Sequence, residues 1–165
     1  MNSKLLISFI LFFVSLNLLG QENDDSIRKA VLKSNVTDSL YVFGEWNEAG
    51  GTETHLRYLG VIKSLNDEYK IMTSSWFWGQ SKRATSKILV FDLTNRYIGC
   101  YNVGMTYDLP EKIENSQIVF LHSKTNDCDN KNVTRLSFEN GIPHEFFVEC
   151  KDGYGDVYSF SMVKE

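Results

Sequence analysis

The sequence predicts an all-β domain of mainly antiparallel strands, a single-domain barrel or two-layer sandwich with a short N-terminal helix. Two observations carry this prediction. A helical period of apolar residues occurs near the N-terminus, and after it apolar residues recur with a period of two in many short segments. Turn residues separate these segments, and the chain has only 2 prolines. We therefore expect one domain in which consecutive strands pair antiparallel.

Residues 1–20, MNSKLLISFILFFVSLNLLG, have the order of a secretory signal peptide. Lys4 precedes an apolar run over residues 5–14, and the small Gly20 lies just before Gln21. This run is shorter than the roughly 20 residues that a membrane-spanning helix needs. We expect cleavage near Gly20 and Gln21, and a secreted or periplasmic mature chain without a membrane span. A lipid anchor would require Cys where Gln21 stands, so we expect none.

Residues 21–38 are the predicted helical segment. Within DDSIRKAVLKSN, Ile27 and Val31 share one face, and either of the two leading aspartates could cap the helix. After this segment the period of the apolar residues changes from helical to two. Residues 39–165 are therefore the predicted antiparallel β domain.

Nine segments of the β domain are rich in β-branched or aromatic residues, as strands are. Tight turns at residues 140–141 (Asn-Gly) and 152–153 (Asp-Gly) suit antiparallel hairpins. Residues 88–91, ILVF, are apolar on both faces, so we expect the helix or a partner to cover the second face. The nine segments are SLYVFGEW, THLRYLGVIKS, EYKIMTSSWFWG, SKILVFDL, RYIGCYNVGM, SQIVFLHS, VTRLSFE, HEFFVECK and DVYSFSMV.

Charge and cysteine content narrow the possible functions. The formal net charge of -4 gives the chain no overall attraction for a phosphate backbone, so nucleic-acid binding is disfavoured. The 3 cysteines of an exported chain can form one disulfide and leave one thiol over. Cys128 and Cys150 flank a predicted hairpin, whereas Cys100 lies within an apolar strand. We therefore expect Cys128 to pair with Cys150, and Cys100 to be buried.

Gly44-Glu45-Trp46 resembles the Gly-x-Trp signature near the first strand of lipocalins, which are small exported barrels that hold apolar ligands. The resemblance covers these three residues and the overall size. It departs from the family because NEAGG turns the chain directly after Trp46, and because no helix follows the last predicted strand. What the resemblance implies is a barrel architecture; the alternative is that Trp46 closes one end of a core.

The stretch SSWFWGQSKRATSK holds the candidate ligand-binding residues. Trp76 and Trp78 share one face of their strand and could stack against a sugar ring or a small apolar ligand. Lys82 and Arg83 follow in a predicted loop, together with Lys87, and could hold an anion. Trp46 is a further aromatic candidate. Core packing is the favoured alternative for the two tryptophans, and a solvated turn for the cations.

The sequence shows few patterns typical of a catalytic or metal-binding site. His55, His122 and His144 are scattered and show no metal-ligand spacing. Residues 126–132, NDCDNKN, are rich in oxygen ligands but lack the pattern of a calcium loop. We expect no catalytic residue that the sequence can name, no metal site and no cofactor.

The resulting hypothesis is an exported, non-catalytic binding or interaction module. Its ligand would be a small apolar or sugar-like molecule, or it would bind an envelope protein partner, without nucleic acid. Two alternatives stay open: a structural, partner-binding protein of the cell envelope, and an extracytoplasmic hydrolase with a site not visible in the sequence. The hydrolase would need one of the histidines to meet a carboxylate or thiol in a cleft.

Overall fold

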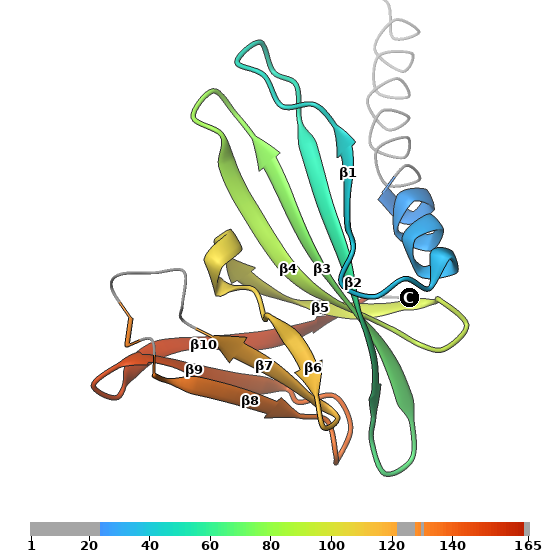
Figure 1. Cartoon of the computed structure of the whole chain (residues 1–165), viewed down its shortest axis with the longest axis vertical. Helices are drawn as coiled ribbons and strands as arrows, with labels where there is room; N and C mark the ends of the chain where they lie inside the picture. Colours follow the sequence, from blue (N-terminus) through green and yellow to red (C-terminus); the bar gives the residue numbers. More distant parts are fainter. Residues whose placement is uncertain (1–23, 122–127, 130, 164–165) are drawn as a thin grey trace, which may run out of the picture.

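The computed structural model describes residues 24–121, 128–129 and 131–163, so the predicted signal peptide and its cleavage site lie outside the described residues. The described chain forms one helix over residues 24–34, ten strands and a 3-10 turn at Thr106–Asp108 (Figure 1). The strands are β1 (Leu40–Gly44), β2 (Glu53–Lys63), β3 (Glu68–Trp78), β4 (Arg83–Phe91), β5 (Tyr97–Gly104), β6 (Lys112–Glu114), β7 (Gln117–Leu121), β8 (Val133–Ser137), β9 (Glu145–Lys151) and β10 (Tyr154–Met162).

The strands form two antiparallel sheets, as predicted. The hairpin expected at residues 140–141 does not form, because β8 and β9 lie in different sheets. The larger sheet has the order β1-β2-β3-β4-β5-β10-β9, and the smaller sheet has the order β6-β7-β8. Strand β10 pairs with β5, which lies far from it in the sequence. Because β1 and β9 remain as edges, the described chain forms an open two-layer arrangement and not a closed barrel. The barrel implied by the resemblance of Gly44-Glu45-Trp46 is therefore wrong. Trp46 itself follows the end of the edge strand β1.

A shared hydrophobic core fills the space between the two sheets. Ile88 and Val90 of β4 point into it, and so does Tyr101 of β5. The Tyr101 ring is fully buried beside Phe146 and Phe160, and its hydroxyl donates a hydrogen bond to the carbonyl of Pro143 at 2.5 Å. The smaller sheet contributes Ile118, Phe120 and Leu136 to this core.

The helix covers the other side of the larger sheet, which we call the helix face (Figure 1). Val31 and Leu32 are buried there against a second core cluster on β2, β3, β4 and β5. This confirms that the doubly apolar residues 88–91 are covered on both faces, with the helix as the second cover. Burying each of the two side chains stabilises the fold by about 1.5–3 kcal/mol. The cluster on the sheet consists of Leu56, Tyr58, Met72, Leu89, Phe91 and Cys100.

The two leading aspartates of the helical segment do not cap it. Asp24 and Asp25 both lie within the helix, where they form ion pairs with Arg28 and Lys29 at 2.8 and 2.6 Å. The paired residues are four positions apart and therefore lie on the same side of the helix. A capping residue has non-helical dihedral angles, so residues within the helix do not act as the cap. In the described residues, no helix combines the length and apolar character required to cross a membrane.

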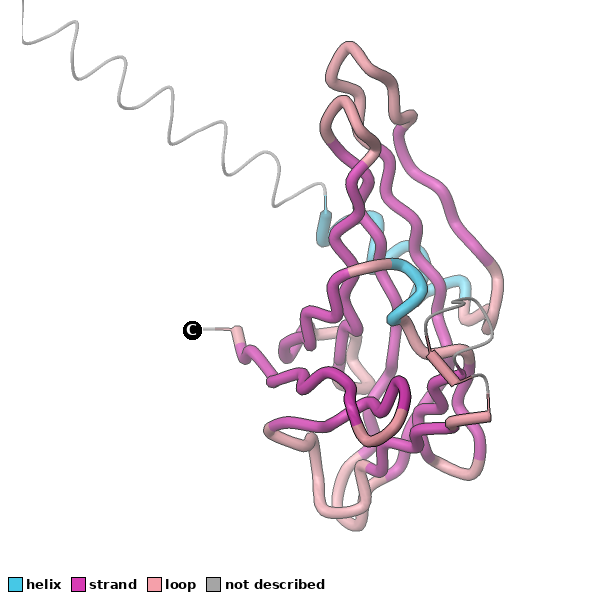
Figure 2. The backbone as a smooth tube through the Cα atoms, turned by 90° about the vertical axis from the view of Figure 1, so that its left-hand side faces the viewer, coloured by secondary structure: helices cyan, strands magenta, loops and turns pink. Residues whose placement is uncertain are grey.

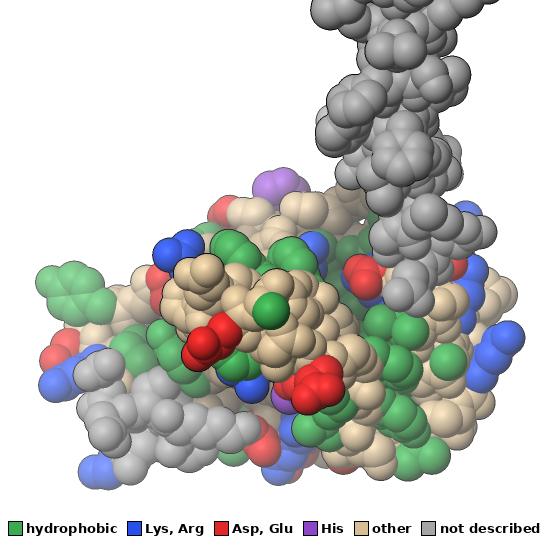
Figure 3. Space-filling model, turned by 90° about the horizontal axis from the view of Figure 1, so that it is seen from above, with side chains coloured by type: hydrophobic (Ala, Val, Ile, Leu, Met, Phe, Trp, Pro, Cys, Tyr) green, Lys and Arg blue, Asp and Glu red, His purple; other side chains and the backbone are tan. Residues whose placement is uncertain are grey.

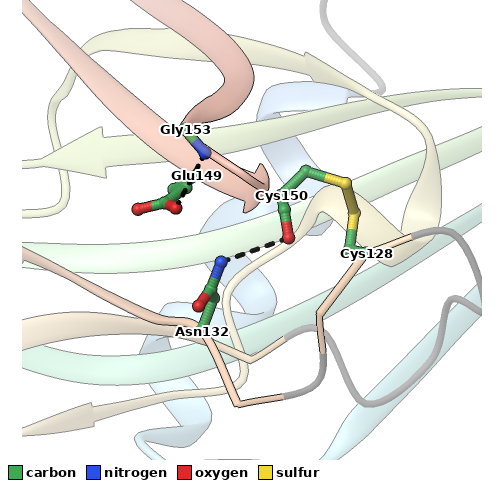
Figure 4. The surroundings of a disulfide bond; sticks show 5 residues. All are labelled: Cys128, Asn132, Glu149, Cys150 and Gly153. Carbon is green, nitrogen blue, oxygen red and sulfur yellow. Dashed lines mark hydrogen bonds between the residues drawn. A yellow bond between two sulfur atoms is a disulfide. The ribbon is translucent and has the colours of Figure 1, made fainter.

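The predicted disulfide between Cys128 and Cys150 is confirmed (Figure 4). It ties the segment before β8 to the end of β9, and the carbonyl of Cys150 also accepts a hydrogen bond from the Asn132 side chain at 3.3 Å. Cys100 is a free thiol and is buried, again as predicted. Within residues 126–132, which were considered as a calcium loop, Asn126 and Asp127 lie outside the described residues.

Candidate functional site

Strands β2, β3 and β4 run beyond the helix, toward the loops at one end of the molecule (Figure 2). Their pairing fixes which side chains share the helix face there. Trp76 lies opposite Thr54 on one side and Thr85 on the other, and Ser74 lies opposite Lys87. Because directly opposed residues of an antiparallel pair point to the same face, these five side chains form one surface.

A groove with a volume of about 770 Å³ opens between this surface and the helix. Four of its side chains carry hydroxyl groups, and Trp76 and Phe43 provide apolar area. Hydroxyls beside an aromatic face can bind a ring that is itself apolar on its faces and polar at its edges. The lining residues are Asp24, Ile27, Arg28, Phe43, Gly44, Thr52, Thr54, Ser74, Trp76, Thr85 and Lys87.

The two tryptophans of β3 stack on each other at the open end of the helix face. Their ring centroids are 5.7 Å apart at an interplanar angle of 23°. Trp78 is half-buried and donates its indole N–H to Thr85 Oγ1 at 3.1 Å, and the Arg83 guanidinium lies 5.7 Å from its ring. Trp76 is 44% exposed. The favoured expectation of core packing is therefore wrong for Trp76, because no described element covers this end of the helix face.

The remaining candidates, Trp46 and Lys82, lie on the opposite face of the sheet. Lys82 Nζ is 5.2 Å from the Trp46 ring centroid and 5.5 Å from that of Phe77, whose side chain alternates with that of Trp76. The Trp46 indole donates a hydrogen bond to the Gly79 carbonyl at 2.8 Å. Trp46 belongs to neither core cluster, so it does not close a core. The five predicted residues thus divide into Trp76, Trp78 and Arg83 on one face, and Trp46 and Lys82 on the other.

Sequence reasoning missed most of the groove. Isolated hydroxyl residues are common in strands, so the sequence did not predict a binding role for Thr54, Ser74 or Thr85. Arg83 is predicted in a loop, and Lys87 both in that loop and in the strand segment SKILVFDL, whereas both lie within β4. The available signal was the loss of apolar alternation near the end of β3, where Ser74 replaces a core residue on the face that carries Met72.

Charges of both signs are distributed over this end of the molecule. Viewed from above, acidic and basic side chains are interspersed with hydrophobic and other polar groups (Figure 3). Within the groove, Arg28 forms an ion pair with Asp24, and its guanidinium lies 5.5 Å from the Tyr97 ring. Lys87 is the other basic residue of the lining. The groove therefore carries a slight positive excess.

One histidine meets a carboxylate on the opposite face. His55 Nε2 lies 2.6 Å from Glu53 Oε1, and this hydrogen bond is the main reason that the pKa of Glu53 is lowered. His55 and Ser75 line a cavity of about 170 Å³ together with other side chains of β1–β3 and with residues of the segment between β5 and β6. His144 is exposed, and His122 lies outside the described residues. The His–carboxylate contact that a hydrolase would need thus exists at His55.

No group of three or more His, Cys, Asp or Glu side chains in the described ranges is arranged to hold a metal ion. The groove of the helix face and the His55 cavity are the two candidate sites. No protein-family model matches the sequence, and no curated protein or solved structure shows significant similarity to it.

Proposed function

We propose that the protein is an exported, non-catalytic binding module that holds a sugar-like ligand in the groove of the helix face. The observation that carries this proposal is the exposed Trp76, which stacks on Trp78 beside the groove. A pyranose ring has an apolar face of C–H groups and a rim of hydroxyls. The indole face of Trp76 can pack against the C–H face, and the hydroxyls of Thr54, Ser74 and Thr85 can form hydrogen bonds with the sugar hydroxyls.

Export is part of the proposal. The first twenty residues have the order of a signal peptide, with cleavage expected near Gly20 and Gln21. The Cys128–Cys150 disulfide is consistent with export, because disulfides persist in oxidising compartments and are rare in the cytosol. The mature chain would then meet its ligand in the periplasm or outside the cell.

Screening of the mature chain on neutral and uronic-acid oligosaccharides, followed by calorimetry with the tightest binder, tests the function. We expect Trp76→Ala to weaken binding at least tenfold, because burial of an aromatic face contributes about 1.5–3 kcal/mol and 1.4 kcal/mol is tenfold in Kd. Trp46→Ala is the matched control, since Trp46 lies on the opposite face and should leave binding unchanged. Absence of binding to every oligosaccharide, or equal losses in the two variants, would contradict the proposal.

A hydrolase is the second candidate, favoured by the His55–Glu53 contact of 2.6 Å. His55 could act as a general base, with Glu53 orienting its ring. Release of nitrophenol from a panel of nitrophenyl esters and glycosides tests this function. Activity that His55→Ala and Glu53→Gln both abolish would establish the hydrolase and displace the binding module.

An envelope protein with a bound partner is the third candidate. Leu40 and Val42 of the edge strand β1 are exposed to 60% and 51%, so this edge could add a strand from another chain. Light scattering on the purified mature chain distinguishes the cases. A stable assembly that Val42→Lys dissociates would favour this candidate, and a monomer that binds oligosaccharide would favour the binding module.

A further inference from the structure

We infer that the ligand of the groove is an acidic sugar, a uronic-acid residue whose carboxylate is bound by Lys87. This inference rests on the proposed function, since it names the substrate class of the same groove. Lys87 lies in the middle of β4, opposite Ser74 on β3, and two positions along from Thr85, which lies opposite Trp76.

The strand register places the Lys87 ammonium within reach of a ring stacked on Trp76. Trp76 and Lys87 are diagonal neighbours on one face, and such pairs lie about 7–8 Å apart in a sheet. This separation is about one sugar ring with a carboxylate substituent. A ring that packs on the indole can therefore direct a carboxylate at its edge toward Lys87, with Ser74 and Thr85 beside it as hydroxyl partners.

Lys87 has no counter-charge in the described part of the chain. Its side chain is half-buried, yet its ammonium forms neither a hydrogen bond nor an ion pair with any described residue. Asp24, the acidic residue of the groove lining, is already bound to Arg28 at 2.8 Å. An ammonium without a partner in the groove lining favours an anion that enters the groove, because it can then form a charge-assisted hydrogen bond.

The other nearby cations are engaged with aromatic rings. Arg83 lies over Trp78 on the helix face, and Lys82 lies over Trp46 and Phe77 on the opposite face. Lys82 also contributes to the lowered pKa of Glu53 through its positive charge. Of the three basic residues considered for an anion, Lys87 is therefore the one whose ammonium has no described partner. A single ammonium flanked by hydroxyls suits a monovalent carboxylate better than a phosphate, which favours several donors or an Arg fork.

Calorimetry with a matched ligand pair tests this inference. The probes are uronic-acid oligosaccharides based on galacturonate, glucuronate and mannuronate, and the methyl ester of each, which keeps the ring and removes the charge. We expect the wild-type chain to bind the preferred acid about tenfold tighter than its ester. The acid and its ester should bind to Lys87→Met with equal affinity, and this affinity should be close to that of the wild-type chain for the ester. Lys82→Met is the matched control and should retain the preference.

Each outcome decides one question. The inference is supported if Lys87→Met loses the preference for the acid over the ester, keeps the melting temperature of the wild type, and Lys82→Met retains the preference. If Lys87→Met fails to fold, Lys87→Gln replaces it. Equal binding of acid and ester by the wild type, with both lost in Trp76→Ala, overturns the inference and leaves the proposed function standing. A preference that persists without Lys87 overturns the inference as well. Absence of binding to every probe overturns the inference, and overturns the proposed function as well if the neutral oligosaccharides also fail to bind. A dimer that Trp76→Ala dissociates overturns both.

Discussion

At the scale of single residues, the tyrosines show how the core handles polar groups. Tyr101 is fully buried with its hydroxyl bonded to Pro143, and burial raises the pKa of this phenol well above its usual range. Burial likewise raises the pKa of Tyr158 in the same core, with the charges of Asp108 and Asp156 as smaller causes. The folded chain therefore keeps these phenols neutral to a higher pH than the unfolded chain does.

These shifts predict a loss of stability at alkaline pH. The folded pKa of Tyr101 lies above its unfolded value of about 10, so its contribution is fully present below pH 10 and decreases as the pH rises above it. We expect the free energy of unfolding in urea to be lower at pH 11 than at pH 8. Tyr101→Phe should show a smaller decrease between these pH values. Equal stability of the wild type at both pH values would contradict this expectation.

Some residue-level features could be predicted from the sequence and others could not. The burial of Cys100 followed from its apolar strand. The pairing of Cys128 with Cys150 is correct, although the hairpin from which it was predicted does not form, because β8 and β9 lie in different sheets. The exposure of Trp76 did not follow, because alternation shows which side chains share a face and not where the cover of that face ends. The separation of Lys82 from Trp76 depends on the geometry of the loop between β3 and β4.

At the scale of elements, the helix over residues 24–34 determines where the groove lies. It covers the part of the helix face that carries Leu56, Met72 and Leu89, and leaves Ser74 and Trp76 beside a groove. The sequence predicted both the helix and the strands with two apolar faces. It could not predict the open sheet, because the pairing of β5 with β10 joins residues about sixty positions apart, and no local pattern encodes such a contact.

Truncation of the helix contact tests its structural role. Leu32 is 2% exposed and packs on the second core cluster. We expect Leu32→Ala to lower the free energy of unfolding in urea by about 2–5 kcal/mol, because the cavity left under the helix adds to the lost transfer energy. Lys33→Ala, on the exposed side of the same helix, should change it by less than about 0.5 kcal/mol. Equal effects of the two variants would show that the helix is not packed as described.

At the scale of the whole molecule, the two faces of the larger sheet are covered differently. The opposite face packs on the smaller sheet and builds the main core, whereas the helix face carries a smaller core under the helix and the groove beside it. The disulfide lies with the smaller sheet and β9, away from the groove residues on β1–β4. The proposed ligand would therefore contact the helix face and not the main core.

The most direct test of the binding site follows the indole N–H signals of the 3 tryptophans in a proton–nitrogen NMR spectrum during titration with the tightest-binding uronic oligosaccharide. Trp→Phe variants assign the three signals. A ligand in the groove should shift the signals of Trp76 and Trp78, which stack on the helix face, and leave that of Trp46 in place. A shift of the Trp46 signal alone, or of none of the three, would contradict a binding site at the groove.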